Sequence, residues 1–282
     1  MPTLAYHVVD VFTDRPFAGN PLAVVLDADD LSTEQLQAVA REFNLSETAF
    51  PLPSERADYR VRIFTPNQEL PFAGHPSVGT AWLLARLGRI RTGGVLQECG
   101  AGILPVEVTG DGATLTGGEP TVSEPLDPAP LLAAAGLEAG DAAGVPPRTA
   151  GTGLPWTYLP VVPEAVARAA PDWVGLPRAV TSMGLAVFSW DEDSRAAHLR
   201  GFTDEGFEDP ATGSATLGLG VFLAASGLVP PDGVTAYRVS QGAEVGRPST
   251  LDGAVTTSGG RVEQATVRGS VAPVAVGELT RP

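Results

Sequence analysis

The sequence predicts an α+β protein built from two similar halves, each a strongly curved mixed β-sheet wrapped around one buried helix. Two observations predict this class. First, two helix-forming stretches, 74–88 and 213–227, align with glycines in register at Gly74/Gly213, Gly79/Gly218 and Gly88/Gly227. Second, β-rich segments separated by turn residues surround both stretches. The offset, 213 − 74 = 139 residues, is about half of the 282-residue chain and indicates duplicated domains.

The two aligned stretches should be interior helices. In the second, a polar loop over 208–215 leads into the apolar run 216–228, and a helix that is apolar on most faces must be buried all round. The first N–H groups of a helix have no partner within it and carry the positive end of its dipole, so we expect each loop to seat an anion such as a carboxylate. Chance alignment of small residues is the alternative, because the chain contains 33 glycines.

The first half alternates strands with one amphipathic helix. Ser32 and Gln35 form a capping-box pair before that helix, which should end near Asn44. A turn at 65–68 should precede the first interior helix. The strands are expected over 4–12, 21–26, 59–64, 95–99, 103–108 and 113–116, and an extended segment is expected at 46–50.

The second half should begin after a linker over 117–130, whose glycines, prolines and acids are typical of a connecting segment. A short helix is expected at 131–135, followed by a mobile surface loop at 136–147. The remaining strands are expected over 156–162, 185–189, 234–241, 254–257, 262–268 and 271–276, and residues 199–202 should lead into the second interior helix.

Composition excludes several classes of function. The net charge is −15 with a pI near 4.5, which argues against nucleic acid or an anionic membrane as a partner. All 18 basic residues are arginine. The absence of lysine excludes a Schiff-base or pyridoxal-phosphate mechanism, a lysine general base and the lysine of a phosphate-binding P-loop.

We expect no metal and no disulfide. Cys99 is the single cysteine, and His7, His75 and His198 lie far apart in the sequence without metal-ligand spacing. The N-terminal residues lack a basic segment followed by an apolar one, and no apolar run approaches about 18 residues. The cytoplasm is therefore the expected compartment.

Three polar residues are placed for proton-transfer chemistry. Glu47 lies between a helix end and a β-rich run, where burial would raise its pKa toward neutrality. His75 and Asp209 introduce the two repeated helices. If the halves face each other, these groups would meet in a cleft where helix N-termini hold a substrate carboxylate while an acid/base moves a proton.

Each of these residues has a purely structural interpretation. Glu47 could be a surface strand residue, Asp209 before Pro210 a helix cap, and His75 before Pro76 a cap or turn residue. Ser214 as a hydrolase nucleophile is a further alternative, although its surroundings, TGSAT at 212–216, are not a G-x-S-x-G elbow.

Six blocks of the sequence resemble the PhzF-like phenazine biosynthesis isomerase family, in that family's order and over nearly the whole chain. The blocks are FTDRPFAGNP at 12–21, NLSETAF at 44–50, RIFTP at 62–66, ELPFAGHP at 69–76, EDPATGSA at 208–215 and QGAEVGRPS at 241–249. The resemblance implies the diaminopimelate epimerase-like fold with two pseudo-symmetric lobes. It also implies a homodimer and a C-terminal strand that returns to the first lobe, so that 1–117 with 271–282 form one domain and 118–270 the other.

The resemblance also implies a reaction. The phenazine member isomerises trans-2,3-dihydro-3-hydroxyanthranilate without a cofactor. By match, Glu47 would be the acid/base that takes a proton from one ring carbon and returns it to another. His75, Asp209 and Ser214 would orient the substrate and assist the shuttle, and Gly74 and Gly213 would lend backbone N–H groups.

The chain departs from the epimerase branch of that superfamily, which needs a cysteine from each half. Cys99 lies outside both loops, so two-thiol racemisation is not expected. The sequence thus predicts a cofactor-independent isomerase acting on a small amino- or hydroxy-carboxylate. The alternative is a catalytically inactive binding or regulatory protein of the same fold.

Overall fold

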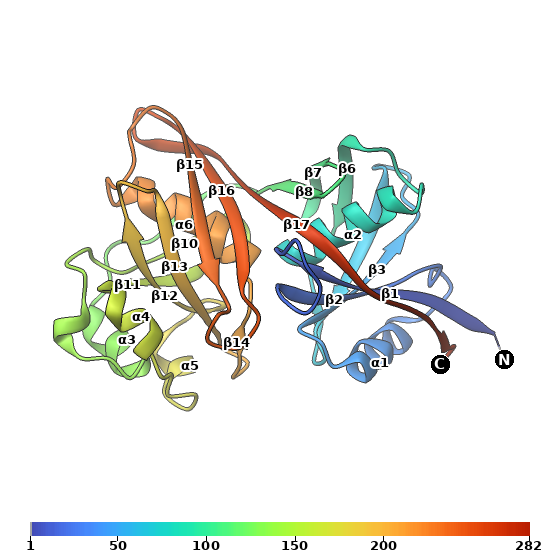
Figure 1. Ribbon diagram of the computed structural model, residues 1–282, viewed down its shortest axis with the longest axis horizontal. Coiled ribbons are helices and arrows are strands. Elements are labelled where there is room, and N and C mark those ends of the chain that lie inside the picture. Colours follow the sequence, from blue (N-terminus) through green and yellow to red (C-terminus); the bar gives the residue numbers. More distant parts are fainter. Residues whose placement is uncertain (1) are drawn as a thin grey trace. The chain divides into compact units, whose positions relative to one another are not determined.

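The computed structural model describes residues 2–282, and the chain divides into two compact units. The N-terminal unit contains residues up to Thr116 together with Arg268–Pro282, and the C-terminal unit contains Gly117–Val267. The boundaries expected from the sequence are 117/118 and 270/271. Within each unit, strands surround one central helix (Figure 1), and the predicted α+β class is confirmed.

Eight strands close into a barrel in the N-terminal unit. Two pairs of strands are parallel, β2 (Asn20–Val25) with β3 (Glu47–Leu52) and β4 (Tyr59–Phe64) with β6 (Gly93–Cys99), which gives the mixed sheet predicted from the sequence. The two-residue strand β5 (Glu69–Leu70) pairs with β4 outside this closed set. Around the barrel the strands are β1 (Thr3–Val11), β2 (Asn20–Val25), β3 (Glu47–Leu52), β4 (Tyr59–Phe64), β6 (Gly93–Cys99), β7 (Gly102–Val108), β8 (Gly112–Thr116) and β17 (Arg261–Thr280), which pairs again with β1.

The interior of this barrel is occupied by α2 (Gly74–Arg86), whose residues 74–84 are all buried. The helix approaches the sheet closely at Gly79, where an added Cβ would lie 2.7 Å from side-chain atoms of Leu22 and Val11. Outside the barrel, α1 (Thr33–Phe43) begins at the predicted capping box of Ser32 and Gln35 and ends at Asn44, whose φ is +51°. It covers Phe50 and Phe64 of the sheet.

The C-terminal unit repeats this plan around α6 (Gly213–Ala225), whose residues 213–223 are all buried. Both interior helices span thirteen residues and start 139 positions apart, so the duplication predicted from the glycine register is confirmed. The strands of this unit are β9 (Thr121–Val122), β10 (Arg148–Gly151), β11 (Trp156–Pro160), β12 (Gly184–Asp191), β13 (Ala196–Thr203), β14 (Glu208–Asp209), β15 (Gly233–Gln241), β16 (Ser249–Ser258) and the start of β17.

Short helices cover the outside of this sheet. They are α3 (Pro128–Ala134), α4 (Pro163–Arg168) and α5 (Leu176–Ala179), and they bury apolar side chains against β11, β12 and β13. The segment 136–147, expected to be a mobile loop, contains a 3₁₀ turn over Ala139–Asp141. The Asp141 carboxylate accepts hydrogen bonds from the Glu138 N–H at 2.9 Å and from Arg168 at 2.8 Å, which anchors the turn.

One prediction about the strands was wrong. The sequence indicates two strands, 262–268 and 271–276, separated at Gly269, but β17 runs unbroken from Arg261 to Thr280. The residue within this continuous strand is glycine because a Cβ at position 269 would overlap the buried ring of Phe12. Among residues 2–282, no helix combines the length and the apolar character needed to cross a membrane.

Candidate active site

Glu47 and His75 lie next to each other in the N-terminal unit. Glu47 begins β3, His75 is the second residue of α2, and Glu47 Oε2 is 3.4 Å from His75 Nε2. The His75 side chain is only 4% exposed and that of Glu47 17% exposed. Two of the predicted site residues are thus brought together in a largely enclosed position at the start of the interior helix.

The His75 ring is neutral and its tautomer can be assigned. Burial lowers the pKa of His75 to about 3, against a smaller opposing effect of a hydrogen bond to the backbone of Pro21. Because proline has no N–H, the ring must donate to the Pro21 carbonyl. Nε2 faces Glu47 and has no hydrogen-bond partner of normal geometry within residues 2–282. The proton is therefore on Nδ1, and the Nε2 lone pair is directed toward the Glu47 carboxyl group.

The start of α2 is arranged to receive a negative group. Ala73, the residue before the first turn, provides no side-chain cap, and the first turn contains no acidic residue. Pro76 has no N–H, so the N–H groups of Gly74 and His75 are the donors at this end. The positive end of the dipole favours a carboxylate or a developing oxyanion here.

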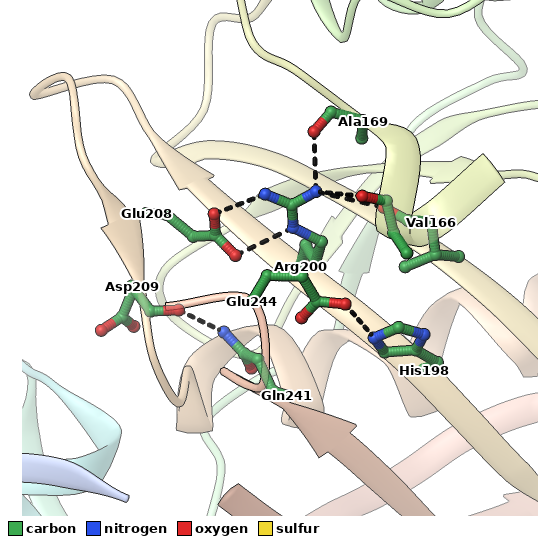
Figure 2. Close-up of polar contacts among 9 residues, drawn as sticks. Val166, Ala169, His198, Arg200, Glu208, Asp209, Gln241 and Glu244 are labelled. Carbon is green, nitrogen blue, oxygen red and sulfur yellow. Dashed lines mark hydrogen bonds and ion pairs between the residues drawn. The ribbon is translucent and has the colours of Figure 1, made fainter. Parts of the chain in front are cut away.

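In the C-terminal unit, Asp209 is buried on β14, four residues before α6 begins at Gly213. Thr212 donates its hydroxyl to Asp209 Oδ2 at 2.6 Å. The Gln241 side-chain amide donates to the Asp209 backbone carbonyl at 2.7 Å (Figure 2). Gly213 begins α6, and Thr212 before it makes no side-chain cap, so this helix start also lacks a side-chain partner.

Ser214 lies in the first turn of α6 and is buried. Its Oγ accepts a hydrogen bond of 3.0 Å from the indole N–H of Trp156. In the part of the chain that the structure describes, no histidine or carboxylate hydrogen-bonds to this hydroxyl. A serine hydrolase needs such a base to activate the nucleophile, so the arrangement does not favour Ser214 as a nucleophile.

An ion-paired cluster adjoins the Asp209 loop. Arg200 on β13 forms a bidentate pair with Glu208, at 2.9 and 2.7 Å, and also donates to the carbonyls of Ala169 and Val166 at the end of α4 (Figure 2). His198 Nε2 lies 3.0 Å from Glu244. The cluster ties β14, which carries Asp209, to the sheet and to α4.

Sequence reasoning assigned no role to four residues that contact the predicted site. Trp156 acts through a long-range contact for which the sequence holds no local signal. Pro21 lies in the block at 12–21, but its contact with His75 is long-range. The sequence does carry a signal for the other two. Thr212 follows Asp209 by three residues, a spacing that permits a hydrogen bond between their side chains, and Gln241 begins the block at 241–249. Cys99, by contrast, is the last residue of β6, away from both helix starts in the sequence, and burial raises the pKa of its thiol.

Comparison with known proteins gives consistent matches over nearly the whole chain. Residues 9–277 match the family model PhzC-PhzF, described as phenazine biosynthesis-like protein. An uncharacterized isomerase of Mesorhizobium japonicum is 38% identical, with 99% of each chain covered. The trans-2,3-dihydro-3-hydroxyanthranilate isomerase of Pseudomonas aeruginosa is 37% identical, with 96% of this chain and 98% of that protein covered.

The fold has solved counterparts as well. The crystal structure of a phenazine biosynthesis protein of the PhzF family from Bacillus anthracis superposes with a TM-score of 0.89 at 27% identity, covering 99% of this chain and 100% of the other. The architecture is the diaminopimelate epimerase-like fold expected from the resemblance.

Proposed function

This chain belongs to the PhzC-PhzF family of phenazine biosynthesis-like proteins, and from that premise we propose that it is an isomerase that moves a proton within a small carboxylate-bearing substrate. The substrate class we propose is an amino- or hydroxy-carboxylate related to dihydro-hydroxyanthranilate. Support comes from the Pseudomonas aeruginosa relative, whose name states that reaction, and from the chemistry of the residues around Glu47.

The observation that carries the proposal is the pair formed by Glu47 and His75. In the proposed mechanism the Glu47 carboxylate removes a proton from a substrate carbon. The protonated Glu47 then donates that proton to a second carbon, so the carboxylate is regenerated and no other reactant is consumed. The Nε2 lone pair of neutral His75, 3.4 Å away, would accept a hydrogen bond from the protonated Glu47 and hold the proton between the two transfers.

The helix starts complete the proposed site. The N–H groups of Gly74 and His75 would stabilise negative charge on the substrate as the proton leaves carbon. We propose that Asp209, Gly213 and Ser214 contribute to the same site and orient the polar groups of the substrate. With one cysteine in the sequence, we propose carboxylate chemistry without a cofactor rather than exchange between two thiols.

A solvent-deuterium screen tests the proposal. Amino- and hydroxy-carboxylates, beginning with trans-2,3-dihydro-3-hydroxyanthranilate, would be incubated with the protein in heavy water and followed by NMR. We expect carbon-bound deuterium in a turned-over compound, and Glu47→Gln should lower the rate by about 10² or more because it keeps the shape and removes the base. Glu42→Gln, an exposed position on α1, is the matched control.

Two outcomes would count against the proposal. Unchanged turnover in Glu47→Gln would remove Glu47 as the base. Tight binding of a carboxylate without any deuterium incorporation would instead identify the protein as a binding or regulatory member of the family. We further propose a cytoplasmic homodimer; light scattering on the purified protein measures the subunit number.

A further inference from the structure

We propose that Thr212 and Gln241 are positioning residues that keep Asp209 in its deprotonated form. In this arrangement Asp209 Oδ2 accepts a hydrogen bond from the Thr212 hydroxyl, and Gln241 orients that hydroxyl. The inference deepens the proposed function, because it assigns the shuttled proton to Glu47 and a fixed negative charge to Asp209.

The orientation of the Gln241 amide is fixed by two backbone groups. The N–H of Thr212, which can only donate, lies 3.0 Å from one amide atom, so that atom is the oxygen Oε1. The carbonyl of Asp209, which can only accept, lies 2.7 Å from the other, which is therefore the nitrogen Nε2. Two independent contacts give the same assignment.

The direction of the Thr212 hydroxyl follows from that assignment. Gln241 Nε2 also donates to Thr212 Oγ1, at 2.9 Å. The hydroxyl proton is then directed to Asp209 Oδ2 at 2.6 Å, within the range of a bond from a hydroxyl to an ionised oxygen. The donors run in one direction, from Gln241 to Thr212 to Asp209, and end on an acceptor.

The network is enclosed. Asp209, Thr212 and Gln241 are all buried. Their hydrogen bonds therefore lie in surroundings of low polarity, where losing one bond leaves a buried polar group unpaired and lowers stability. Gly201 on β13 pairs with Asp209 on β14 and, having no side chain, leaves room for the Thr212 and Gln241 side chains. A Cβ at position 201 would lie 2.9 Å from Thr212 Oγ1 and 3.2 Å from Gln241 Nε2.

Two ion pairs lie close to Asp209 in the C-terminal unit. Glu208 on β14 pairs with Arg200 on β13, and Glu244 in the loop after β15 pairs with His198 on β13 (Figure 2). The hydrogen bond from the Thr212 hydroxyl is a contact that favours the ionised form of Asp209, and a single substitution removes it.

The consequence for the proposed reaction is a division of roles between the two acids. A carboxylate held in its ionised form has no proton to donate, so Asp209 would attract a hydrogen-bond donor of the substrate, such as an ammonium or hydroxyl group. Glu47, beside a neutral histidine that can accept its proton, would alternate between its two forms.

The test is the titration of Asp209 in the full-length protein, followed by NMR of chains carrying ¹³C-labelled aspartate carboxyl groups, with the signal assigned by Asp209→Asn. Thr212→Val removes the donor without changing the shape and should raise the titration midpoint of Asp209 by about one pH unit. Thr212→Ser retains the hydroxyl and should restore the wild-type midpoint. If Thr212→Val does not fold, the smaller Thr212→Ala makes the same prediction.

Thr109→Val is the matched control, because Thr109 donates to Asp111 at 2.7 Å on the surface of the N-terminal unit. It should leave the Asp209 midpoint unchanged. An Asp209 midpoint that is the same in wild type and Thr212→Val would overturn the inference. The titration needs no substrate, so its outcome is independent of whether Glu47→Gln abolishes turnover.

Discussion

At the scale of single residues, the property that matters most is the neutral state of His75. A histidine beside a carboxylate often gains a proton, but here burial outweighs that attraction and lowers the pKa to about 3. The ring donates to Pro21 and turns its lone pair toward Glu47. Glu47 and His75 were predictable as candidates from their neighbours in the sequence. The Pro21 contact that fixes the tautomer was not, because it joins positions 54 residues apart.

The neutral state of His75 predicts how folding stability depends on pH. In the unfolded chain His75 titrates near its ordinary pKa of 6.5, and in the folded protein near 3. Below pH 6.5 the unfolded state therefore binds a proton that the folded state does not, so stability falls as the pH is lowered from 6.5 toward 3. At pH 4.5 the loss from this residue is roughly 2–3 kcal/mol.

His75→Asn isolates this contribution, because asparagine can still donate to the Pro21 carbonyl and does not titrate. Urea unfolding at pH 7 and pH 4.5 should show a smaller loss of stability in the variant than in wild type. All carboxylates are common to both proteins, so the difference between the two slopes reports His75. Equal slopes would mean that His75 is protonated in the folded protein.

At the scale of elements, the repeated glycines within the two interior helices have different neighbours. At Gly79 of α2 the three atoms nearest to a Cβ would be side-chain atoms of Leu22, Val11 and Val9. At Gly218 of α6 it would meet the Tyr158 hydroxyl and lie 2.9 Å from the backbone carbonyl of Ala150. Side chains can shift, whereas the carbonyl belongs to β10 and cannot move without displacing the strand.

We therefore predict that Gly218→Ala destabilises the protein even though alanine is the better helix former by about 1 kcal/mol. Overpacking should outweigh that gain and lower the free energy of unfolding by about 1–2 kcal/mol. Gly79→Ala should have a smaller effect. Gly110→Ala, where a Cβ meets nothing within 4 Å, is the control. Stabilisation by Gly218→Ala in urea unfolding would contradict the packing argument.

The elements also show where sequence reasoning succeeds and where it stops. The interior helices were predictable because an apolar run between glycines has no solvent-facing side, and α1 because its capping box is local. The continuity of β17 was not predictable, because a glycine at position 269 suggests the end of a strand. The reason for a glycine there is the Phe12 ring, which packs over it and is distant in the sequence. Likewise, α4 was missed because six residues are too few to show a helical period.

At the scale of the whole molecule, β17 is the element that contributes residues to both compact units. In the N-terminal unit it pairs with β1 from Thr3↔Thr280 to Val11↔Val271 and also with β8. It also accepts backbone hydrogen bonds from Phe12 and Thr13 at the Ser270 carbonyl. Closure of this barrel around α2 thus depends on the last fifteen residues of the chain, 268–282.

A chain that ends at Val267 should consequently lose order in the N-terminal unit first. Without the rest of β17, β1 and β8 become open edges and one wall around α2 is missing. Hydrogen exchange followed by mass spectrometry compares the two repeated helices directly, and we expect amides of α2 to exchange at least about 10-fold faster while those of α6 keep their protection.

A chain ending at Thr280, which loses Arg281 and its ion pair with Asp30, is the control and should resemble wild type. Equal loss of protection in α2 and α6 would show instead that the two units unfold together, and the barrel closure would then stabilise the whole chain rather than one unit.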